Sequence, residues 1–313
     1  MRMSEWLVSY PHRLDSFLAE EGRVLSREKA KRAIEEGHVR VNDVIVKKPA
    51  HRLEPGDRVI VSDDASTPTE SAIEPKDLHL EILYEDEQCF VINKPAGYSV
   101  HPGAGAIDEP TILHGVALLF TKMKIPFSSE SVLVHRLDKD TTGCLLIAKN
   151  PAAHIALQKQ FETRTVKKTY LALVAGIPEK SQAKIDAPIG RSSMNPTKMA
   201  ITGTSTSREA QTTYRIVGKA SNVALLECDL HTGRTHQIRV HLAGIGHPVL
   251  GDSSYSSALS ERVVQEWEVE SLCLHAWKLT FESPADAKDH AIEAHLPAQF
   301  LEILKKLNIN FLA

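Results

Sequence analysis

The chain has 313 residues, a net charge of −3 and four cysteines. This length is sufficient for two domains or for one large one, and a core of this size needs no disulfides. The cysteines lie far apart, form no Cys-x-x-Cys pair and sit in apolar stretches, which favours buried thiols in a reducing compartment. The N-terminus lacks an apolar signal core, and no later stretch approaches the roughly 20 apolar residues of a membrane span. We therefore expect a soluble, cytoplasmic protein without a membrane partner.

Charge is distributed unevenly along the chain. Residues 27–32 contain four cations and one acid, whereas residues 63–75 contain acids and no Lys or Arg. The overall negative charge argues weakly against a nucleic-acid partner, because proteins that bind nucleic acids often carry a basic surplus. The local pattern indicates a small basic module that precedes a more acidic body.

The N-terminal module is predicted to contain two helices and a small β-meander. Leu14, Phe17 and Leu18 follow helical spacing, and a second helix is predicted from an N-cap at Ser26 to Glu36. Three short alternating runs follow, over residues 38–42, 43–49 and 56–62, separated by turn residues. The module therefore spans residues 12–61, and the polar stretch over residues 62–77 is predicted to be a linker.

The body, residues 78–313, mixes strands, hairpins and helices without a repeat. Strands are expected within residues 80–95 (two), 131–134, 143–149, 167–176, 222–230 and 272–282. Helices are expected within residues 111–120, 150–161 with Asn150 as N-cap, 235–243 and 297–307. Residues 190–214 are polar and irregular, which predicts a flexible loop. The mixture indicates an α+β fold with a large antiparallel-rich mixed sheet flanked by helices.

The tetrapeptide His-Arg-Leu-Asp occurs twice, at residues 12–15 and 135–138. In the first copy Leu14 begins the apolar stripe of a helix, so Asp15 is predicted to face water near the helix N-terminus. In the second copy an apolar strand leads into the tetrapeptide, and another apolar strand follows. Asp138 is therefore expected in a loop on a rigid scaffold, the usual placement of catalytic groups. The alternative is an Asx-type turn made by Asp138 or Asp140.

The second copy belongs to a larger set of motifs. The stretch "VHRLDKDTTGCLLIAK" resembles the signature of the RluA family of pseudouridine synthases. Four further stretches resemble motifs of the same family in the same order: "VINKPAGYSVHPG", "KKTYLALVAG", "HTGRTHQIRVHLAGIGHPVLGD" and "LCLHAWKLTF". Residues 12–61 separately resemble the S4-type RNA-binding domain, which the ribosomal-RNA members of the family (RluC and RluD types) carry at their N-termini.

The resemblance implies an isomerase that detaches uracil from ribose, turns the base and rejoins it through carbon. No cofactor is needed, and the sequence contains neither of the glycine-rich nucleotide-binding motifs nor a Cys-rich metal spacing. His231, His236 and His241 are spaced by five, so no single element can bring all three to one metal. We therefore expect neither a cofactor nor a metal, and we expect His241 to cap or to complement the end of a helix.

By the resemblance, the catalytic residues are Asp138, Tyr170 and Arg234. Asp138 would act on the sugar or the base as an ionised carboxylate, and Arg234 would pair with it and lower its pKa. Tyr170 would stack on the uracil or help to remove the base proton. The residues alone leave alternatives open: Arg234 could contact a phosphate or form a structural ion pair, and Tyr170 could be a core aromatic residue.

Two further residues of the body would bind the substrate nucleotide. A stacked uridine must be flipped out before a side chain can reach its glycosidic bond. The resemblance implies that Arg136 fills the gap left by the base and that Leu274 forms an apolar wall beside it. Phosphate contact remains an alternative for Arg136, and core packing for Leu274.

The basic part of the module is predicted to hold RNA phosphates away from the chemistry. The residues concerned are Arg13, Arg27, Lys31 and Arg32, together with Arg40, Lys47 and Lys48. Because Glu28, Glu35 and Glu36 offset part of this charge, a solvated helix face is the alternative.

The expected substrate is large-subunit (23S) ribosomal RNA, and we expect a monomeric enzyme. Three other functions remain open: a pseudouridine synthase for transfer RNA, a non-catalytic ribosomal-RNA-binding assembly factor with the same fold, and an Asp-dependent hydrolase of small molecules. A hydrolase would give no reason for residues 12–61.

Overall fold

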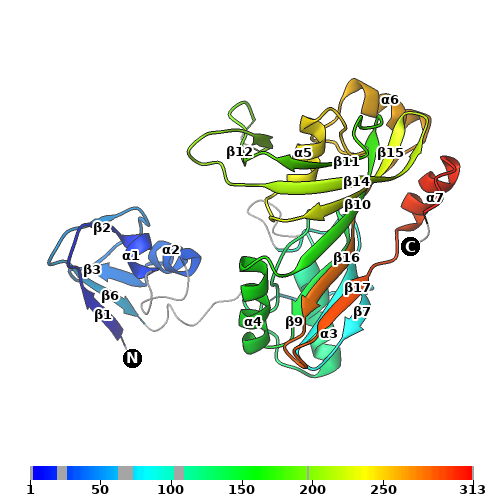
Figure 1. Ribbon diagram of the computed structural model, residues 1–313. Helices are drawn as coiled ribbons and strands as arrows, with labels where there is room; N and C mark the ends of the chain where they lie inside the picture. The colour runs from blue at the N-terminus through cyan, green and yellow to red at the C-terminus, as the bar shows by residue number, and fades with distance from the viewer. Residues whose placement is uncertain (1–2, 20–26, 63–72, 102–108, 196, 312–313) are drawn as a thin grey trace. The chain divides into compact units, whose positions relative to one another are not determined.

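The computed structural model describes residues 3–19, 27–62, 73–101, 109–195 and 197–311 (Figure 1). The chain divides into two compact units, Met1–Ala72 and Ile73–Ala313. The predicted helix start at Ser26 and most of the predicted linker lie outside the described residues.

The first unit combines two helices with short strands. They are β1 (Met3–Leu7), β2 (His12–Arg13), α1 (Leu14–Leu18), α2 (Arg27–Glu36), β3 (Val39–Val41), β4 (Val44–Ile45), β5 (Arg52–Leu53) and β6 (Arg58–Ser62). The predicted helix pair and the strands after it are confirmed. The larger sheet has the order β1-β6-β3-β4, so β6 pairs with β3 and β1 instead of following β4. Strand β1 precedes residue 12, and its largely exposed residues give no apolar alternation in the sequence.

Two residues of the first copy of the tetrapeptide, Leu14 and Asp15, lie in the core of this unit, whereas Arg13 is exposed. Leu14, Phe17 and Leu18 are buried, as their helical spacing predicted. The prediction that Asp15 faces water is wrong, because the residue is only 6% exposed. Its Oδ2 accepts a hydrogen bond from Arg13 Nη2 at 2.8 Å, and its Oδ1 accepts one from the Ser16 amide at 2.9 Å. Charge-assisted hydrogen bonds of this kind allow a carboxylate to be buried.

The second unit is built on one nine-stranded sheet. Eight strands follow the order β11-β14-β15-β10-β16-β9-β8-β7, and β17 pairs with β16 (Figure 1). Every pairing in this sheet is antiparallel except that of β16 with β9, so the predicted antiparallel-rich mixed sheet is confirmed. The strands are β7 (Glu81–Glu85), β8 (Cys89–Lys94), β9 (Thr142–Ala148), β10 (Lys167–Ala175), β11 (Gln182–Asp186), β14 (Gln211–Ala220), β15 (Val223–Leu230), β16 (Leu274–Glu282) and β17 (Asp289–Glu293).

The parallel contact between β9 and β16 is short. It joins His275 to Thr142 and Ala276 to Gly143, and from Lys278 onward β16 pairs with β17 instead. Gly143 has φ +109°, and a Cβ there would lie 2.3 Å from the carbonyl oxygen of Ala276. Only glycine permits this approach of two backbones. The glycine that follows the second tetrapeptide therefore fixes the start of β9 against the centre of the sheet.

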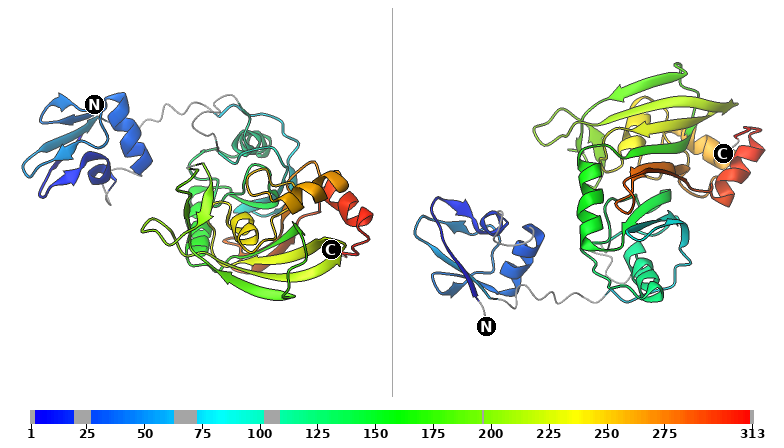
Figure 2. Two further views of the ribbon diagram at one scale, coloured as in Figure 1. Left: turned by 90° about the horizontal axis from the view of Figure 1, so that it is seen from above. Right: turned by 60° about the horizontal axis from the view of Figure 1, so that its bottom comes forward.

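Helices cover the sheet on different sides. They are α3 (Ile112–Met123), α4 (Pro151–Glu162), α5 (Gln237–Gly244), α6 (Ala258–Glu266) and α7 (Ala298–Lys306). Helices α3, α5, α6 and α7 contribute to the main core, whereas α4 packs in a second cluster with β8 and β9. Figure 2 shows α6 and α7, in orange and red, at the same end of the unit. The predicted N-cap of α4 is confirmed, because Asn150 Oδ1 accepts a hydrogen bond from the Ala153 amide at 2.9 Å.

Two predictions about irregular segments are wrong. Residues 131–134 form no strand and make only an isolated bridge between Leu133 and Ile147. Residues 190–214 are not simply a loop, since β12 (Ile189–Arg191) and β13 (Met199–Ile201) form a hairpin within them. Elsewhere the four cysteines are free and buried, as predicted. Among the described residues, no helix combines the length and the apolar character that crossing a bilayer would require.

Candidate active site

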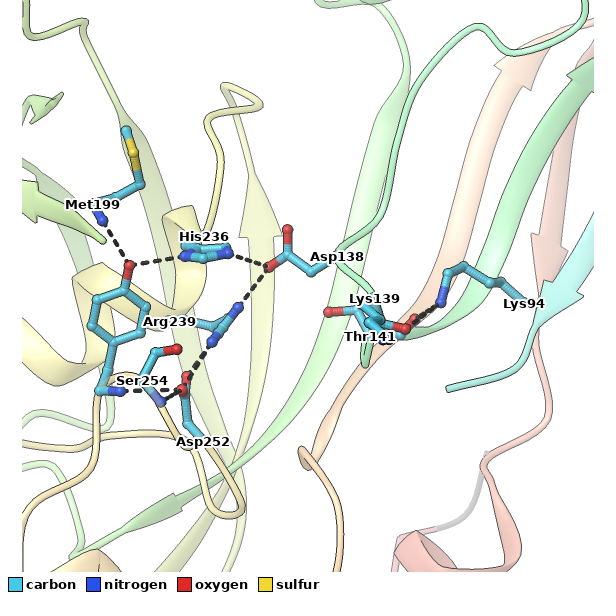
Figure 3. A network of polar contacts seen from close by, with 10 residues as sticks. Lys94, Asp138, Lys139, Thr141, Met199, His236, Arg239, Asp252 and Ser254 are labelled. Atoms are coloured by element: carbon cyan, nitrogen blue, oxygen red, sulfur yellow. Dashed lines mark hydrogen bonds and ion pairs between the residues drawn. The ribbon is translucent and has the colours of Figure 1, made fainter. Parts of the chain in front are cut away.

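A buried lysine holds the loop that carries Asp138. The side chain of Lys94, at the end of β8, is fully buried and donates hydrogen bonds to the carbonyl oxygens of Pro95, Lys139 and Thr141 at 2.8, 2.8 and 2.9 Å (Figure 3). Burial lowers the pKa of Lys94 to about 8, while Asp140 and Asp138 oppose this shift. The three donors of one ammonium group therefore fix the backbone on the C-terminal side of Asp138.

Asp138 forms an ion pair with Arg239 of α5. Arg239 Nη1 donates to Asp138 Oδ2 at 3.1 Å, and the same guanidinium donates to both carboxylate oxygens of Asp252, at 2.7 and 2.9 Å. Burial alone would raise the pKa of Asp252, but the hydrogen bonds from Arg239 and from the amides of Ser254 and Tyr255 lower it overall. Asp252 thus orients Arg239, and Arg239 orients Asp138.

The predicted pairing of Arg234 with Asp138 is wrong. Arg234 Nε donates instead to the carbonyl oxygen of Glu209 at 3.0 Å. Both arginines lie in "TGRTHQIR", but Arg234 precedes α5 whereas Arg239 is within the helix and is buried. The sequence contained a signal for this assignment: an arginine between Ile238 and Val240 on a core helix must have a charged partner, because unpaired charges are almost never buried.

The remaining predicted residues of the body line one cavity of about 390 Å³ with Asp138. Tyr170 of β10 and Leu274 of β16 are 8% and 4% exposed and form part of its wall. Arg136 is exposed, and Arg234 is half-buried. Burial, and to a smaller extent the charge of Asp138, raise the pKa of Tyr170, which keeps the phenol neutral. The cavity therefore combines a carboxylate with an aromatic and an aliphatic surface.

Cations outnumber acids around this cavity. Its charged lining residues are Arg136, Arg164, Lys168, Arg234 and Arg239 against Asp138 and Glu162. Burial lowers the pKa of Lys168, with a smaller contribution from Arg164. Such a surplus of guanidinium and ammonium groups suits a polyanionic ligand such as an RNA backbone.

The three histidines considered as metal ligands contact separate partners. His231 Nε2 lies 2.9 Å from Thr213 Oγ1, and His241 bridges Thr212 Oγ1 and the Ala187 carbonyl oxygen, each at 2.9 Å. His241 lies in the last turn of α5, as expected, but its buried side chain bridges β14 and the residue that follows β11. In the part of the chain that the structure describes, no group of three or more His, Cys, Asp or Glu side chains could hold a metal ion.

His236 is a cavity residue that the sequence interpretation missed. Its Nδ1 lies 2.9 Å from Tyr255 Oη, and its Nε2 lies 3.9 Å from Asp138 Oδ2 (Figure 3). Tyr255 Oη in turn accepts a hydrogen bond from the Met199 amide of β13 at 2.9 Å. The segment predicted to be a flexible loop therefore contributes to the surroundings of Asp138.

The predicted RNA-binding cations of the first unit are partly paired with acids. Arg13 contacts Asp15, Lys31 Nζ lies 3.8 Å from Glu35, and Arg32 Nε lies 3.0 Å from Glu36. The side chain of Arg27 lies outside the described part of the chain. The exposed pairs of Lys31 and Arg32 on α2 correspond to the solvated helix face considered as the alternative, whereas Arg13 pairs with a buried carboxylate. RNA contact by these residues stays a prediction.

Comparisons with known proteins show what the chain is similar to. Residues 88–244 match the family described as RNA pseudouridylate synthase, and residues 12–59 match the S4 domain. Ribosomal large subunit pseudouridine synthase D of Zymomonas mobilis is 39% identical over 305 residues, which cover 95% of this chain and 94% of that protein. The protein of the same name from Vibrio cholerae is 37% identical, over 93% of this chain and 90% of that protein. The solved structure of Human RNA Pseudouridylate Synthase Domain Containing 4 superposes with a TM-score of 0.60 at 28% identity and covers 74% of this chain and 94% of that one.

Proposed function

Because this chain belongs to the RNA pseudouridylate synthase family, we propose that it converts specific uridines of large-subunit ribosomal RNA to pseudouridine. The observation that carries the proposal is the cavity itself. It holds Asp138 against Arg239, places Tyr170 and Leu274 in its wall, and has a cationic rim. The match to an S4 domain and the names of the relatives support ribosomal RNA as the substrate.

The reaction is a balanced isomerisation. The bond between C1′ of the ribose and N1 of uracil breaks, a bond between C1′ and C5 forms, C5 loses a proton and N1 gains one. No electrons are exchanged with another reagent. The protein therefore has to reach the glycosidic bond, stabilise the separated sugar and base, and allow one proton to move.

Asp138 is the group that acts at the sugar or the base. Arg239 Nη1 donates a hydrogen bond to its Oδ2, and this charge-assisted bond holds the carboxylate in place. Because the side chain of Asp138 is only 19% exposed, the target base has to leave its stack to reach it. Flipping costs a few kcal/mol and is least costly for bases in loops, so loop uridines are the expected targets.

The other cavity residues receive the flipped nucleotide. Tyr170 stacks on the uracil, which contributes about 1–3 kcal/mol, and Leu274 supplies an apolar surface. Arg136, which is exposed beside the cavity, fills the gap that the base leaves in the RNA. Arg234 contacts phosphate instead of Asp138, because its Nε is held by the carbonyl oxygen of Glu209.

Pseudouridine mapping in cells with and without the gene tests the substrate. We expect one or more pseudouridines to disappear from large-subunit ribosomal RNA and to return when the gene is restored. A loss confined to transfer RNA would show that the substrate class is wrong. Restoration of the pseudouridines by an Asp138→Asn gene would show that the carboxylate mechanism is wrong. Activity on a small molecule that survives deletion of residues 1–62 would support a hydrolase.

A further inference from the structure

The backbone of His236 adopts a conformation that is uncommon for its residue type. His236 is the N-cap of α5 and lies in the left-handed region, with φ 56° and ψ 20°. Residues other than glycine seldom adopt positive φ, and such conformations are frequent at functional sites, where surrounding contacts hold them. Here the contact is the hydrogen bond to Tyr255, and the imidazole reaches the cavity that contains Asp138.

The partners of Tyr255 determine which ring nitrogen of His236 carries the proton. The Met199 amide can only donate, so Tyr255 Oη accepts from it. Among the described residues, His236 Nδ1 is the sole acceptor within hydrogen-bond distance for the phenol proton. We infer that Tyr255 donates to Nδ1, so that the neutral imidazole carries its proton on Nε2. The pKa of Tyr255 is raised, first by burial, which keeps the phenol protonated.

Several groups act on the charge of His236. Burial lowers its pKa most strongly, Asp138 and Asp252 raise it, and Arg239 and Arg136 lower it, with a net shift downward from 6.5. The imidazole is therefore neutral near pH 7. Its Nε2–H group faces Asp138 Oδ2, the same oxygen that accepts a hydrogen bond from Arg239.

We propose that Tyr255 and His236 are positioning residues that, together with Arg239, occupy Oδ2 of Asp138 and leave Oδ1 as the oxygen that acts on the nucleotide. The inference rests on the proposed function, because it assigns a task to each oxygen of the proposed catalytic carboxylate. Figure 3 shows His236 and Arg239 converging on one oxygen while the other points away from both. The 3.9 Å between Nε2 and Oδ2 exceeds a hydrogen bond by about 1 Å, a gap that a small movement on substrate binding closes.

The hydrogen bonds of Tyr255 and His236 also connect the surroundings of Asp138 to the β12–β13 hairpin. Met199 lies on β13, and its amide fixes Tyr255, which fixes His236. A hairpin that moves when RNA binds would thereby alter the donor presented to Asp138.

The tautomer is measured directly by long-range ¹H–¹⁵N spectra of ¹⁵N-histidine-labelled enzyme, with His236→Gln used to assign the signals. We expect a protonated Nε2 and an unprotonated Nδ1 at pH 7.5, and a mixture of tautomers in Tyr255→Phe. A protonated Nδ1 in the parent enzyme would overturn the inference.

Kinetics provide the second measurement. His236→Gln and Tyr255→Phe should each lower kcat about tenfold to a hundredfold with KM for RNA unchanged, as expected for a misplaced catalytic group. Loss of the Tyr255 donor removes a bond to the neutral ring, so the acidic limb of the kcat profile should move to higher pH in Tyr255→Phe. In His236→Gln the part of that limb that reports the titration of His236 should be lost. His247→Gln and Tyr214→Phe are matched controls, since their side chains bond the carbonyl oxygens of Ala175 and Lys180, outside the cavity.

The outcomes separate this inference from the proposed function. If Asp138→Asn is inactive but His236→Gln keeps the parent kcat and acidic limb, the positioning role is overturned and the proposed function stands. An active Asp138→Asn enzyme would overturn the catalytic role of Asp138 and this inference with it, whereas a parent enzyme that forms no pseudouridine in RNA would overturn the proposed function. Circular dichroism and RNA affinity establish that each variant is folded, and if His236→Gln does not fold, the shift of the limb in Tyr255→Phe decides the question.

Discussion

The two copies of His-Arg-Leu-Asp use the same side chains in opposite ways. In the first copy Arg13 donates to both carboxylate oxygens of Asp15, at 3.1 and 2.8 Å, so the tetrapeptide satisfies its own charges. In the second copy the carboxylate of Asp138 is held by Arg239, which lies 101 residues further along the chain. Arg136, the arginine of the second copy, is exposed beside the cavity.

The histidines of the two copies also differ in their surroundings. His12 contacts Tyr10 and Phe17 at ring-centroid distances of 5.4 and 6.1 Å, near the surface of its unit. His135 stacks on Phe161 at 4.6 Å, and its Nε2 accepts a hydrogen bond from the Leu146 amide of β9. Burial lowers the pKa of His135, which keeps it neutral and able to accept. The second aspartate is thus held by a distant helix, while the arginine of its own tetrapeptide stays exposed.

The largest expected effect is that of Asp138→Asn, which removes the charge but not the shape of the side chain. We expect kcat to fall about 10⁴-fold or more, as for other groups that react directly with substrate, while RNA affinity is retained. Because C5 of uracil loses its hydrogen, tritium release from RNA labelled at that carbon measures the rate. If the turnover of Asp138→Asn stays within tenfold of the parent value, the second copy supplies no catalytic aspartate, and the two copies do not differ in this respect.

Replacement of Arg239 should have the next largest effect. Arg239→Lys keeps a positive charge but cannot bridge Asp138 and Asp252, so we expect kcat to fall about 10²-fold. Arg239→Gln leaves the fully buried Asp252 unpaired and should also cost about 3–5 kcal/mol of stability, measured by chemical denaturation.

Arg234→Gln is the matched control for Arg239. Its guanidinium bonds a carbonyl oxygen and not Asp138, so KM should rise a few-fold, with less dependence on salt, while kcat stays near the parent value. If kcat fell strongly in Arg234→Gln while Arg239→Lys stayed fully active, Arg234 and not Arg239 would be the arginine that pairs with Asp138 during catalysis.

Lys94→Met should lower both stability and turnover to a smaller extent. The change leaves three carbonyl oxygens without their donor, which costs about 1–3 kcal/mol, and loosens the loop of Asp138, which lowers kcat about tenfold. Above pH 8 the neutral amine has two protons for three acceptors, so kcat of the parent should fall with a midpoint near the lowered pKa of about 8. Lys94→Met should lack this alkaline limb.

Stability of the parent should change with pH in the opposite direction to kcat. The pKa of Lys94 in the folded protein, about 8, lies below its ordinary value of 10.5. Between these values the unfolded chain binds more protons than the folded one, so the contribution of Lys94 to the free energy of unfolding rises with pH. Denaturation at pH 7.5 and 9.5, compared between parent and Lys94→Met, measures this difference. A parent enzyme whose kcat does not change up to pH 9.5 would contradict the assignment of the alkaline limb to Lys94.

Strong periodicity allowed much of the fold to be predicted. The strand pair β7 and β8, helix α3 and the capped start of α4 all show apolar spacing or cap residues that act over a few positions. The β12–β13 hairpin was missed because its residues are polar and irregular, and its position depends partly on the bond from Met199 to Tyr255. Contacts between residues that lie far apart in the sequence leave no local pattern in it.

The candidate active site was likewise predicted only in part. Asp138, Tyr170 and Leu274 were predicted from motifs and do line one cavity, whereas the partner of Asp138 was assigned to the wrong arginine. The choice between Arg234 and Arg239 depends on where α5 begins and on which side of it faces the core, and helix boundaries are the least certain part of sequence interpretation. His236 was missed because its role requires a left-handed backbone and a tyrosine 19 residues away.

The smallest effect on catalysis should come from Asp15→Asn, the equivalent of the first variant in the other copy. We expect kcat and KM for RNA to stay within about twofold of the parent, since Asp15 is satisfied by its own neighbours and reacts with nothing. The thermal unfolding temperature of the N-terminal unit should nevertheless fall, because a buried carboxylate loses its charge-assisted bonds to Arg13. Differential scanning calorimetry measures that change, and Arg13→Gln, which removes the same pair from its other side, should reproduce it. An Asp15→Asn enzyme with parent stability would show that the local pair contributes nothing, as many exposed pairs do; one with abolished turnover would show that the first copy has a catalytic task of its own.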